Sequence, residues 1–182
     1  VSAWTEGRCS SSGSFVWQKH RSLVASPQGH AVVGVEFVDQ AIHDFFNDHE
    51  IPYEPTALGW RATDEGPPLS LVRHDFMTLN ARQIGRFDAF YDRASVVALP
   101  PDMQVGFGRA LGTMLKPQSP GLLLSFEYPP EQRQGPPFAT DQSRLEEILG
   151  GNFEIHPVER HHLSEDEVQR FGVDWCVVAV YR

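Results

Sequence analysis

The sequence predicts an α/β protein: a doubly wound, mainly parallel, Rossmann-like sheet of seven strands with an antiparallel strand at the C-terminus. Three observations favour this class. An apolar run over 31–35 passes directly into a helical pattern, a second apolar run covers 122–126, and two strand-like segments around a short helix close the chain. Alternating strands and helices are typical of a parallel sheet, and the final pair of strands predicts the antiparallel addition.

The first predicted strand is short and apolar. Residues 32, 33 and 35 are valines, and such a continuous β-branched run is typical of a central strand that is covered on both faces. A helix is expected from about Asp39, because Ile42, Phe45 and Phe46 fall at positions i, i+3 and i+4. This stripe predicts that one face of the helix packs on the sheet.

The middle of the chain mixes short strand signals with turn residues. Two strand-like runs around "DEGPP" (64–68) predict a hairpin that leads into a strand near residues 71–74. The segment "FDAFYDRASVVAL" alternates in apolar character and predicts a strand that ends before Pro100 and Pro101. A helix is expected over "PDMQVGFGRALGTML".

The last third predicts the remaining elements. After the strand over 122–126, the segment "RLEEILGG" places Leu145, Ile148 and Leu149 on one helical face, with Gly150 as the C-terminal stop. "NFEIHPVERH" and "DWCVVAVYR" are the two final strands. Ser164 and Glu167 have the spacing of a capping box for the short helix between them.

Composition restricts the partners. The 182 residues fit one domain, and a net charge of −9 with a pI near 5.3 opposes binding to nucleic acid or to an anionic membrane. Cys9 and Cys176 are too few for a disulfide framework or a zinc ribbon, which fits a reducing cytoplasm. No signal peptide or apolar span is recognisable, so we expect a cytoplasmic monomer that binds a small molecule.

Candidate ligand-binding residues follow the predicted strands, because doubly wound folds bind ligands at the carboxyl ends of their strands. Glu36 ends the first strand, where a carboxylate accepts hydrogen bonds from both hydroxyls of a ribose. This feature is shared by nicotinamide-dependent enzymes and nucleoside-binding methyltransferases. A solvated glutamate that opens a helix is the alternative.

Two further pairs stand at strand ends. Asp75 and Phe76 are placed to receive the edge and the face of an adenine, and the alternative is a helix cap with a core aromatic. Asp92 and Arg93 follow the next strand at the lip of the predicted cleft, where an ordinary surface ion pair is the alternative. Glu127 and Tyr128 occupy the same position after the strand over 122–126.

The segment "GPPF" (135–138) has two prolines that stiffen a loop in which Phe138 can close over a ligand. A plain connector with one core phenylalanine is the alternative. The histidines, including His161 and His162, lack a metal-binding spacing, so no metal site is expected. The sequence has neither a Gly-x-Ser-x-Gly elbow nor a P-loop lysine.

Taken together, "GHAVVGVEF", "HDF", "FDAFYDRASVVALP", "LLLSFEY" and "GPPF" resemble the thiopurine S-methyltransferase family, especially its bacterial branch, over about 28–182. The resemblance implies a class I methyltransferase that uses S-adenosylmethionine and a thiopurine, another thiol, or a selenium or tellurium compound as acceptor. It also implies that Glu36 holds the ribose and that Asp75 and Phe76 flank the adenine. Arg93 is then expected between cofactor and substrate, where it positions the thiolate, and Phe138 on the substrate.

The chain departs from this family before residue 26. The family has a loop of the type Val-Pro-Leu-Cys-Gly-Lys-Ser, then Asp and a Trp-Leu pair, none of which is present. Codons for Gly13 to Arg21 read one nucleotide later permit this loop in order, and Trp17 then forces a glycine. We therefore interpret 1–25 as an aberrant, out-of-frame and disordered segment and 26–182 as the methyltransferase domain. Phe15 stands at the position of the loop leucine, which the resemblance places on the cofactor.

Two alternatives to an active methyltransferase remain open. A nicotinamide-dependent oxidoreductase would also use Glu36, but it predicts a Gly-x-Gly-x-x-Gly turn that neither reading frame supplies. A catalytically inactive methyltransferase-like protein is the second, because Phe15, Val16 and Trp17 have bulky side chains where the cofactor needs a close approach to the backbone. If the enzyme is active, the aromatic rings of Phe76, Tyr91 or Phe138 could contact the sulfonium.

Overall fold

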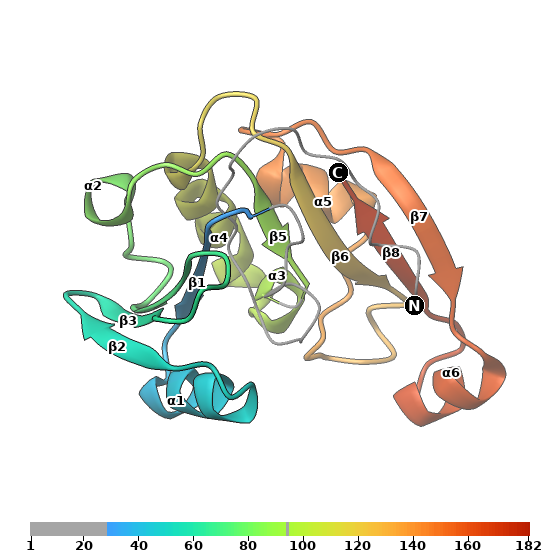
Figure 1. The fold of residues 1–182 in the computed structure, drawn as a ribbon. Helices are drawn as coiled ribbons and strands as arrows, with labels where there is room; N and C mark the ends of the chain where they lie inside the picture. The colour runs from blue at the N-terminus through green and yellow to red at the C-terminus, as the bar shows by residue number, and fades with distance from the viewer. Residues whose placement is uncertain (1–28, 94) are drawn as a thin grey trace.

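The computed structural model describes residues 29–93 and 95–182, so the predictions for 1–25, including the one for Phe15, lie outside the described residues. The described strands form two four-stranded sheets (Figure 1). The first sheet has the order β1 (Val32–Glu36), β4 (Leu69–Arg73), β3 (Gly59–Ala62) and β2 (Tyr53–Thr56). The second has the order β5 (Phe90–Asp92), β6 (Gly121–Glu127), β8 (Val177–Tyr181) and β7 (Pro157–His162).

The first sheet confirms the predicted strand and helix at the start of the domain. β1 pairs in parallel with β4, with Glu36 opposite Arg73. Helix α1 (Asp39–Asp48) buries the expected stripe, Ile42, Phe45 and Phe46, against the sheet. The segment 64–68 connects β3 to β4, and these two strands form an antiparallel pair. β2 pairs with β3 and extends the sheet by one strand.

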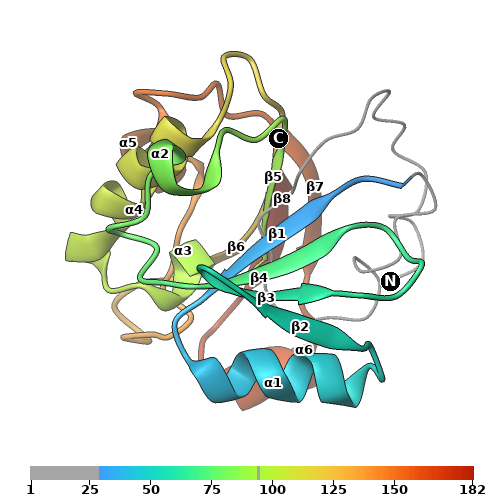
Figure 2. The ribbon, with the colours of Figure 1, turned by 60° about the vertical axis from the view of Figure 1, so that its left-hand side comes forward.

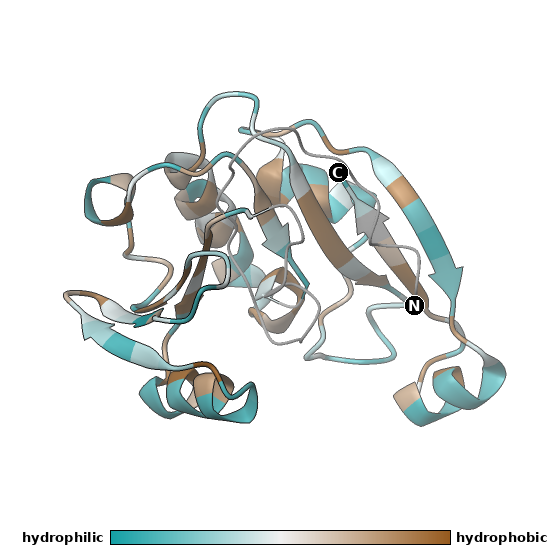
Figure 3. Ribbon diagram, in the orientation of Figure 1, coloured by the Kyte–Doolittle hydropathy of each residue, from teal (hydrophilic) through white to brown (hydrophobic). Residues whose placement is uncertain are grey.

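The second sheet corrects one boundary. The strand expected to reach almost to Pro100 ends at Asp92, and helix α3 (Ser95–Ala98) follows. Val96 and Val97 are both buried, so the apolar character of this segment comes from a short helix that is inserted into the core. In Figure 3, the brown of β6 contrasts with the largely hydrophilic β7, which is the outer edge of this sheet.

Two helices pack side by side against the second sheet (Figure 2): α4 (Pro101–Met114) and α5 (Gln142–Leu149). The predicted α5 face is buried, namely Leu145, Ile148 and Leu149. Gly108 permits the close approach of the two helices, because a Cβ at this position would lie 2.1 Å from the carbonyl oxygen of Ile148. A short helix that the sequence did not indicate, α2 (Ala81–Ile84), precedes β5.

The C-terminal elements agree with the prediction. Helix α6 (Glu165–Phe171) lies between β7 and β8. The carboxylate of Glu167 accepts hydrogen bonds from the Ser164 N–H at 2.9 Å and from its hydroxyl at 2.7 Å, which lowers the pKa of Glu167. The chain leaves α6 at Gly172, whose φ of +77° is left-handed.

The arrangement of strands differs from the single seven-stranded sheet expected. β1–β4 and β5–β6 are parallel, whereas the hairpin strands β2 and β3 and the terminal strands β7 and β8 add antiparallel pairs. Within 29–93 and 95–182, no strand joins the first sheet to the second, because none pairs with both β1 and β5. Among these residues, no helix has the length and apolar character needed to cross a membrane.

Candidate functional site

The strands β1, β4, β5 and β6 end on one side of the molecule, which we call the carboxyl edge. In Figure 1 this is the lower side: the arrowheads of β5 and β6 point downward, and β1 leads down into α1. α6, which precedes the antiparallel β8, also lies on the lower side in Figures 1 and 2. The sequence-predicted ligand residues within the described part of the chain all follow strands at this edge or belong to loops beside it.

Glu36 is the last residue of β1 and is half-buried. Its Oε1 atom accepts a hydrogen bond from the Val38 N–H at 2.8 Å, which turns the carboxylate over the start of the connection to α1. Its backbone carbonyl accepts from the His74 N–H at 3.1 Å, so the ends of β1 and β4 are held together. The structure thus brings Glu36 close in space to the segment that contains Asp75.

Two apolar side chains beside Glu36 were missed by the sequence reasoning. Phe37 is 71% exposed and Val38 is 53% exposed. An aromatic ring that solvent reaches, next to a fixed carboxylate, is a stacking surface for a planar ligand. The available signal was an apolar pair between a strand end and a helix start, where polar capping residues are the norm.

Asp75 and Phe76 have structural partners. Asp75 is exposed, and its Oδ1 accepts from the Met77 N–H at 2.9 Å in a local turn. The half-buried Phe76 ring stacks on Phe107 of α4, with 4.7 Å between ring centroids and 28° between planes. One face of Phe76 therefore docks the loop on α4, which is the core role considered as its alternative.

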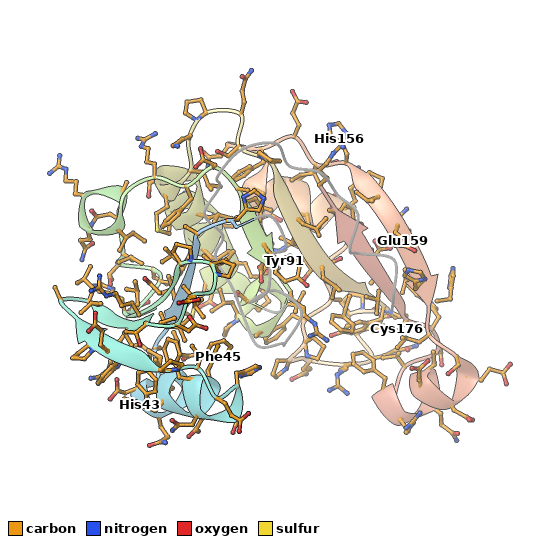
Figure 4. All side chains as sticks on the ribbon, in the orientation of Figure 1. His43, Phe45, Tyr91, His156, Glu159 and Cys176 are labelled. Carbon is orange, nitrogen blue, oxygen red and sulfur yellow. The ribbon has the colours of Figure 1, made fainter. Side chains whose placement is uncertain are left out.

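The structure separates the roles of Asp92 and Arg93. Asp92 is 5% exposed, and its carboxylate accepts from the Ser95 N–H at 2.7 Å and from the Val96 N–H at 3.0 Å. It therefore caps α3, while Arg93 is exposed at the carboxyl edge. Burial raises the pKa of the neighbouring Tyr91, with Arg93 opposing the shift and Asp92 adding to it. Figure 4 labels Tyr91 near the centre of the molecule.

The loop that contains Phe138 is tied to the helix that follows Arg93. The Phe138 N–H donates to the Val97 carbonyl of α3 at 2.6 Å. The Tyr128 hydroxyl donates to the Pro137 carbonyl at 2.6 Å, and Arg133 donates to the Pro136 carbonyl at 3.2 Å. These bonds bring the Phe138 loop beside the end of β5, so the structure joins Arg93 and Phe138 in one region.

Glu127, at the end of β6, is engaged in a polar cluster. Its Oε1 accepts from Arg160 at 3.1 Å and from the Tyr181 hydroxyl. Burial, together with the bond to Glu127, raises the pKa of Tyr181 to about 12. These contacts link β6, β7 and β8 across the sheet, so Glu127 has a structural role.

Further exposed apolar side chains lie at the same edge. Met103, in the first turn of α4, is 41% exposed, and Trp175, just before β8, is 47% exposed. Asp174 is bound to Gln132 by a backbone N–H at 2.8 Å and a side-chain bond at 2.6 Å, which fixes the Trp175 segment against the Phe138 loop. Together with Phe37 and Val38, these make four exposed apolar side chains at the carboxyl edge.

The predicted site residues therefore form two groups. Glu36, Asp75 and Phe76 lie at the end of the first sheet, and Arg93 and Phe138 lie at the end of the second. α4 connects them, because Phe107 contacts Phe76 and belongs to the same core cluster as the α3 valines. In the described ranges, no three His, Cys, Asp or Glu side chains are grouped so that they could hold a metal ion.

The sequence has clear relatives. The model of the thiopurine S-methyltransferase family matches residues 20–182. Thiopurine S-methyltransferase of Shewanella sp. (strain ANA-3) is 33% identical over 156 residues, which cover 85% of this chain and 72% of that protein. Thiopurine S-methyltransferase of Pseudomonas aeruginosa (strain UCBPP-PA14) is 34% identical over 157 residues, with the same coverage.

Solved structures show the same fold at low identity. A SAM-dependent methyltransferase from Methanosarcina mazei has a TM-score of 0.59 and 13% identity, covering 93% of this chain and 91% of that one. The N-methyltransferase NodS from Bradyrhizobium japonicum WM9, in complex with S-adenosyl-L-homocysteine, has a TM-score of 0.53 and 15% identity, covering 86% and 68%. The predicted methyltransferase fold is confirmed by these similarities.

Proposed function

We propose that this chain, which belongs to the thiopurine S-methyltransferase family, uses S-adenosylmethionine to methylate a small thiol at its carboxyl edge. The family makes it a methyltransferase, and the acceptor class is our proposal. The observation that supports it is the grouping at one edge of a fixed carboxylate, Glu36, an exposed cation, Arg93, and four exposed apolar side chains. These groups suit a ligand that combines hydroxyls, planar rings and a negative charge.

The described residues fit the nucleoside half of the cofactor. Glu36 has a carboxylate oriented by the Val38 N–H, and carboxylate oxygens can accept hydrogen bonds from both ribose hydroxyls. The exposed ring of Phe37 offers a face to the adenine, and the exposed Asp75, whose Oδ1 accepts from the Met77 N–H, lies in the neighbouring segment. When bound, S-adenosylmethionine supplies an electrophilic methyl group on a sulfonium.

Arg93 and Phe138 are proposed to hold the acceptor. A guanidinium favours the thiolate over the thiol and so keeps the nucleophilic form present near neutral pH. Phe138 gives the aromatic body of the acceptor an apolar contact, and its loop is held in place by the bond to Val97. Positioning and exclusion of water are then the main contributions of the protein, and no dedicated general base is required.

The residues before 26 are proposed to weaken cofactor binding in the chain as written. The family match begins at residue 20, and we keep the proposal that the segment up to about Ala25 is an out-of-frame translation of the family loop. Side chains such as Phe15 and Trp17 in place of a glycine-rich turn would hinder close approach of the cofactor. The chain as written is therefore expected to bind S-adenosylmethionine weakly. Resequencing that finds no compensating insertion and deletion would reject the frame shift.

Calorimetry tests the cofactor. S-adenosylmethionine, S-adenosylhomocysteine and NAD are titrated into the chain as written and into a chain with the loop restored. We expect S-adenosylhomocysteine to bind the restored chain, and NAD to bind neither. Restored binding without methylation of thiol acceptors would support an inactive methyltransferase-like protein, whereas binding of NAD would support the oxidoreductase alternative.

Substitution of Glu36 tests the ribose contact. In the chain with the loop restored, Glu36→Gln keeps the size but removes the charge, and we expect affinity for S-adenosylhomocysteine to fall about 10-fold to 100-fold, as for loss of charged hydrogen bonds. Glu65→Gln, in the exposed connection before β4, is the matched control and should bind like the parent. Equal affinities for both variants would contradict the assignment of Glu36.

Substitution of Arg93 tests the acceptor contact. In the chain with the loop restored, Arg93→Ala should lower kcat/KM for an aromatic thiol about 10-fold to 100-fold while leaving the affinity for S-adenosylhomocysteine nearly unchanged. Arg109→Ala, on the exposed side of α4, is the control. Equal loss in both variants, or loss of cofactor binding alone, would argue against this role.

We also expect a cytoplasmic monomer, which sedimentation and fractionation can check.

A further inference from the structure

A cavity lies at the opposite edge of the second sheet, away from the proposed methyl-transfer site. Its walls include Phe90 and Gly121, which begin β5 and β6, and Tyr181, which ends the antiparallel β8. We call it the amino-edge cavity. Figure 4 shows His156, which lines this cavity, on the upper side of the molecule, and Cys176, at the start of β8, toward the lower side. The volume of about 610 Å³ is in the usual range for small-molecule sites.

The inner wall of the amino-edge cavity is apolar. Phe153 and Ile155, in the connection between α5 and β7, are its partly buried apolar side chains. Phe90, Leu145 and Leu149 lie behind them in the core. Phe90 and Phe153 contact each other edge to face, with 5.4 Å between ring centroids. Such a lining favours an aromatic or aliphatic group.

The rim of the cavity is cationic. Arg86, Lys116 and Arg182 line it, together with His156 and the side-chain carboxylate of Glu154. Lys116 is paired with Asp88 at 2.5 Å, and His156 lies 3.6 Å from Glu154. Across the described part of the chain, no carboxylate forms an ion pair with the guanidinium of Arg86 or of Arg182. The Arg86 Nη1 donates to the Leu115 carbonyl at 3.4 Å, which leaves its other N–H groups facing the opening. In a protein with a net charge of −9, these N–H groups and the Arg182 guanidinium are available to an anion.

Hydrogen bonds to backbone carbonyls fix both walls of the cavity. On one side, the Lys116 N–H donates to the Phe87 carbonyl at 3.0 Å, and the Ser119 hydroxyl donates to the same carbonyl at 3.1 Å. On the other, His156 and Arg182 exchange two backbone bonds of 2.9 Å each. Both walls are therefore fixed without a ligand, which reduces the cost of ordering on binding.

We propose that the amino-edge cavity is a second binding site, for a small amphipathic carboxylate whose apolar body packs on Phe153 and Ile155 and whose carboxylate meets Arg86 and Arg182. A planar guanidinium binds a carboxylate through two parallel hydrogen bonds, whereas a neutral or cationic head group gains no such contact. This site does not depend on the proposed methyl transfer, because none of the residues assigned to that reaction lines it.

Calorimetry with 4-phenylbutyrate, 4-phenylbutanol and 4-phenylbutylamine tests the proposal on the full chain. The three probes share an apolar body and differ in head-group charge. We expect 4-phenylbutyrate to bind at least 10-fold more tightly than the alcohol, and the amine to bind most weakly. Arg86→Ala and Arg182→Ala should each weaken 4-phenylbutyrate about 10-fold. Arg109→Ala, remote from the cavity, should not change it.

Several outcomes would overturn the site. They are absence of 4-phenylbutyrate binding, equal affinity for the three probes, or unchanged affinity in both rim variants. Competition by S-adenosylhomocysteine would place the probe at the carboxyl edge and would also reject the proposal. Because both rim arginines are exposed, the folded state of each variant can be checked by an unchanged thermal midpoint.

Discussion

Replacing Asp92 by alanine removes a buried carboxylate on which the start of α3 depends. In the native protein this carboxylate accepts two backbone N–H groups, from Ser95 at 2.7 Å and from Val96 at 3.0 Å. Asp92 is 5% exposed, so water cannot easily replace the lost acceptor. Alanine therefore leaves donors unsatisfied near a helix terminus whose next two residues, Val96 and Val97, are buried in the core.

The size of the effect follows from these two bonds. Loss of a capping acceptor costs about 0.5–2 kcal/mol, and a buried polar group without a partner costs about 1–3 kcal/mol. We therefore expect Asp92→Ala to lower the free energy of unfolding by about 2–4 kcal/mol. In a domain of this size, that loss corresponds to a fall of about 4–16 °C in Tm. Asp92→Asn keeps one acceptor oxygen and should lose about half as much.

Urea and thermal unfolding, followed by circular dichroism, measure this loss. Asp88→Ala is the matched control, because Asp88 pairs with Lys116 while its side chain is 39% exposed, and such surface pairs contribute about 0–1 kcal/mol. If Asp92→Ala and Asp88→Ala lose the same stability within about 0.5 kcal/mol, the cap is not what Asp92 provides. Asp92 would then have to be reconsidered as a member of the ligand site.

Two other predictions concern packing and titration. Gly108→Ala should destabilise the protein by about 1–3 kcal/mol or more, because its Cβ would lie 2.1 Å from the carbonyl oxygen of Ile148. Gly151→Ala is the control and should be nearly neutral, because its Cβ would meet nothing within 4 Å. Equal urea midpoints for the two variants would refute the close contact at Gly108. Burial raises the pKa of the Cys176 thiol to about 11, so in a Cys9→Ser chain a thiol reagent at pH 8 should react slowly before unfolding and quickly after it. The pKa of Cys176 is higher in the folded than in the unfolded chain, so its contribution to stability should be complete below pH 9 and should decline as the pH rises from 9 to 11. A Cys176→Ala chain that shows the same decline would contradict this.

Local patterns in the sequence were sufficient for elements whose buried faces are set by near neighbours. The spacing of Ile42, Phe45 and Phe46 predicted α1 and its buried side, and the structure confirms both. The capping residues Ser164 and Glu167 similarly predicted the start of α6. In each case the decisive interactions connect residues a few positions apart, so periodicity contains the information.

The segment around Asp92 shows where this reasoning fails. Alternation over 87–99 predicted one strand, but the chain turns at Asp92, and the following valines are buried by a helix. A valine pair can be buried in either way, and the choice depends on contacts with β6 and α4 that come later in the chain. The exposed Phe37 was missed for a related reason, because exposure is decided by which elements cover a residue.

The sequence by itself determined the α/β class, the positions of most strands and helices, and the candidate ligand residues Glu36 and Arg93, because strand ends and helix faces follow from local periodicity. Only the tertiary structure decided that Asp92 caps a helix and Phe76 packs on Phe107, that the described strands form two sheets, and that a cavity opens at their amino edge. Each of these features joins segments that are distant in the chain or depends on which elements pack together, and no local pattern specifies such contacts.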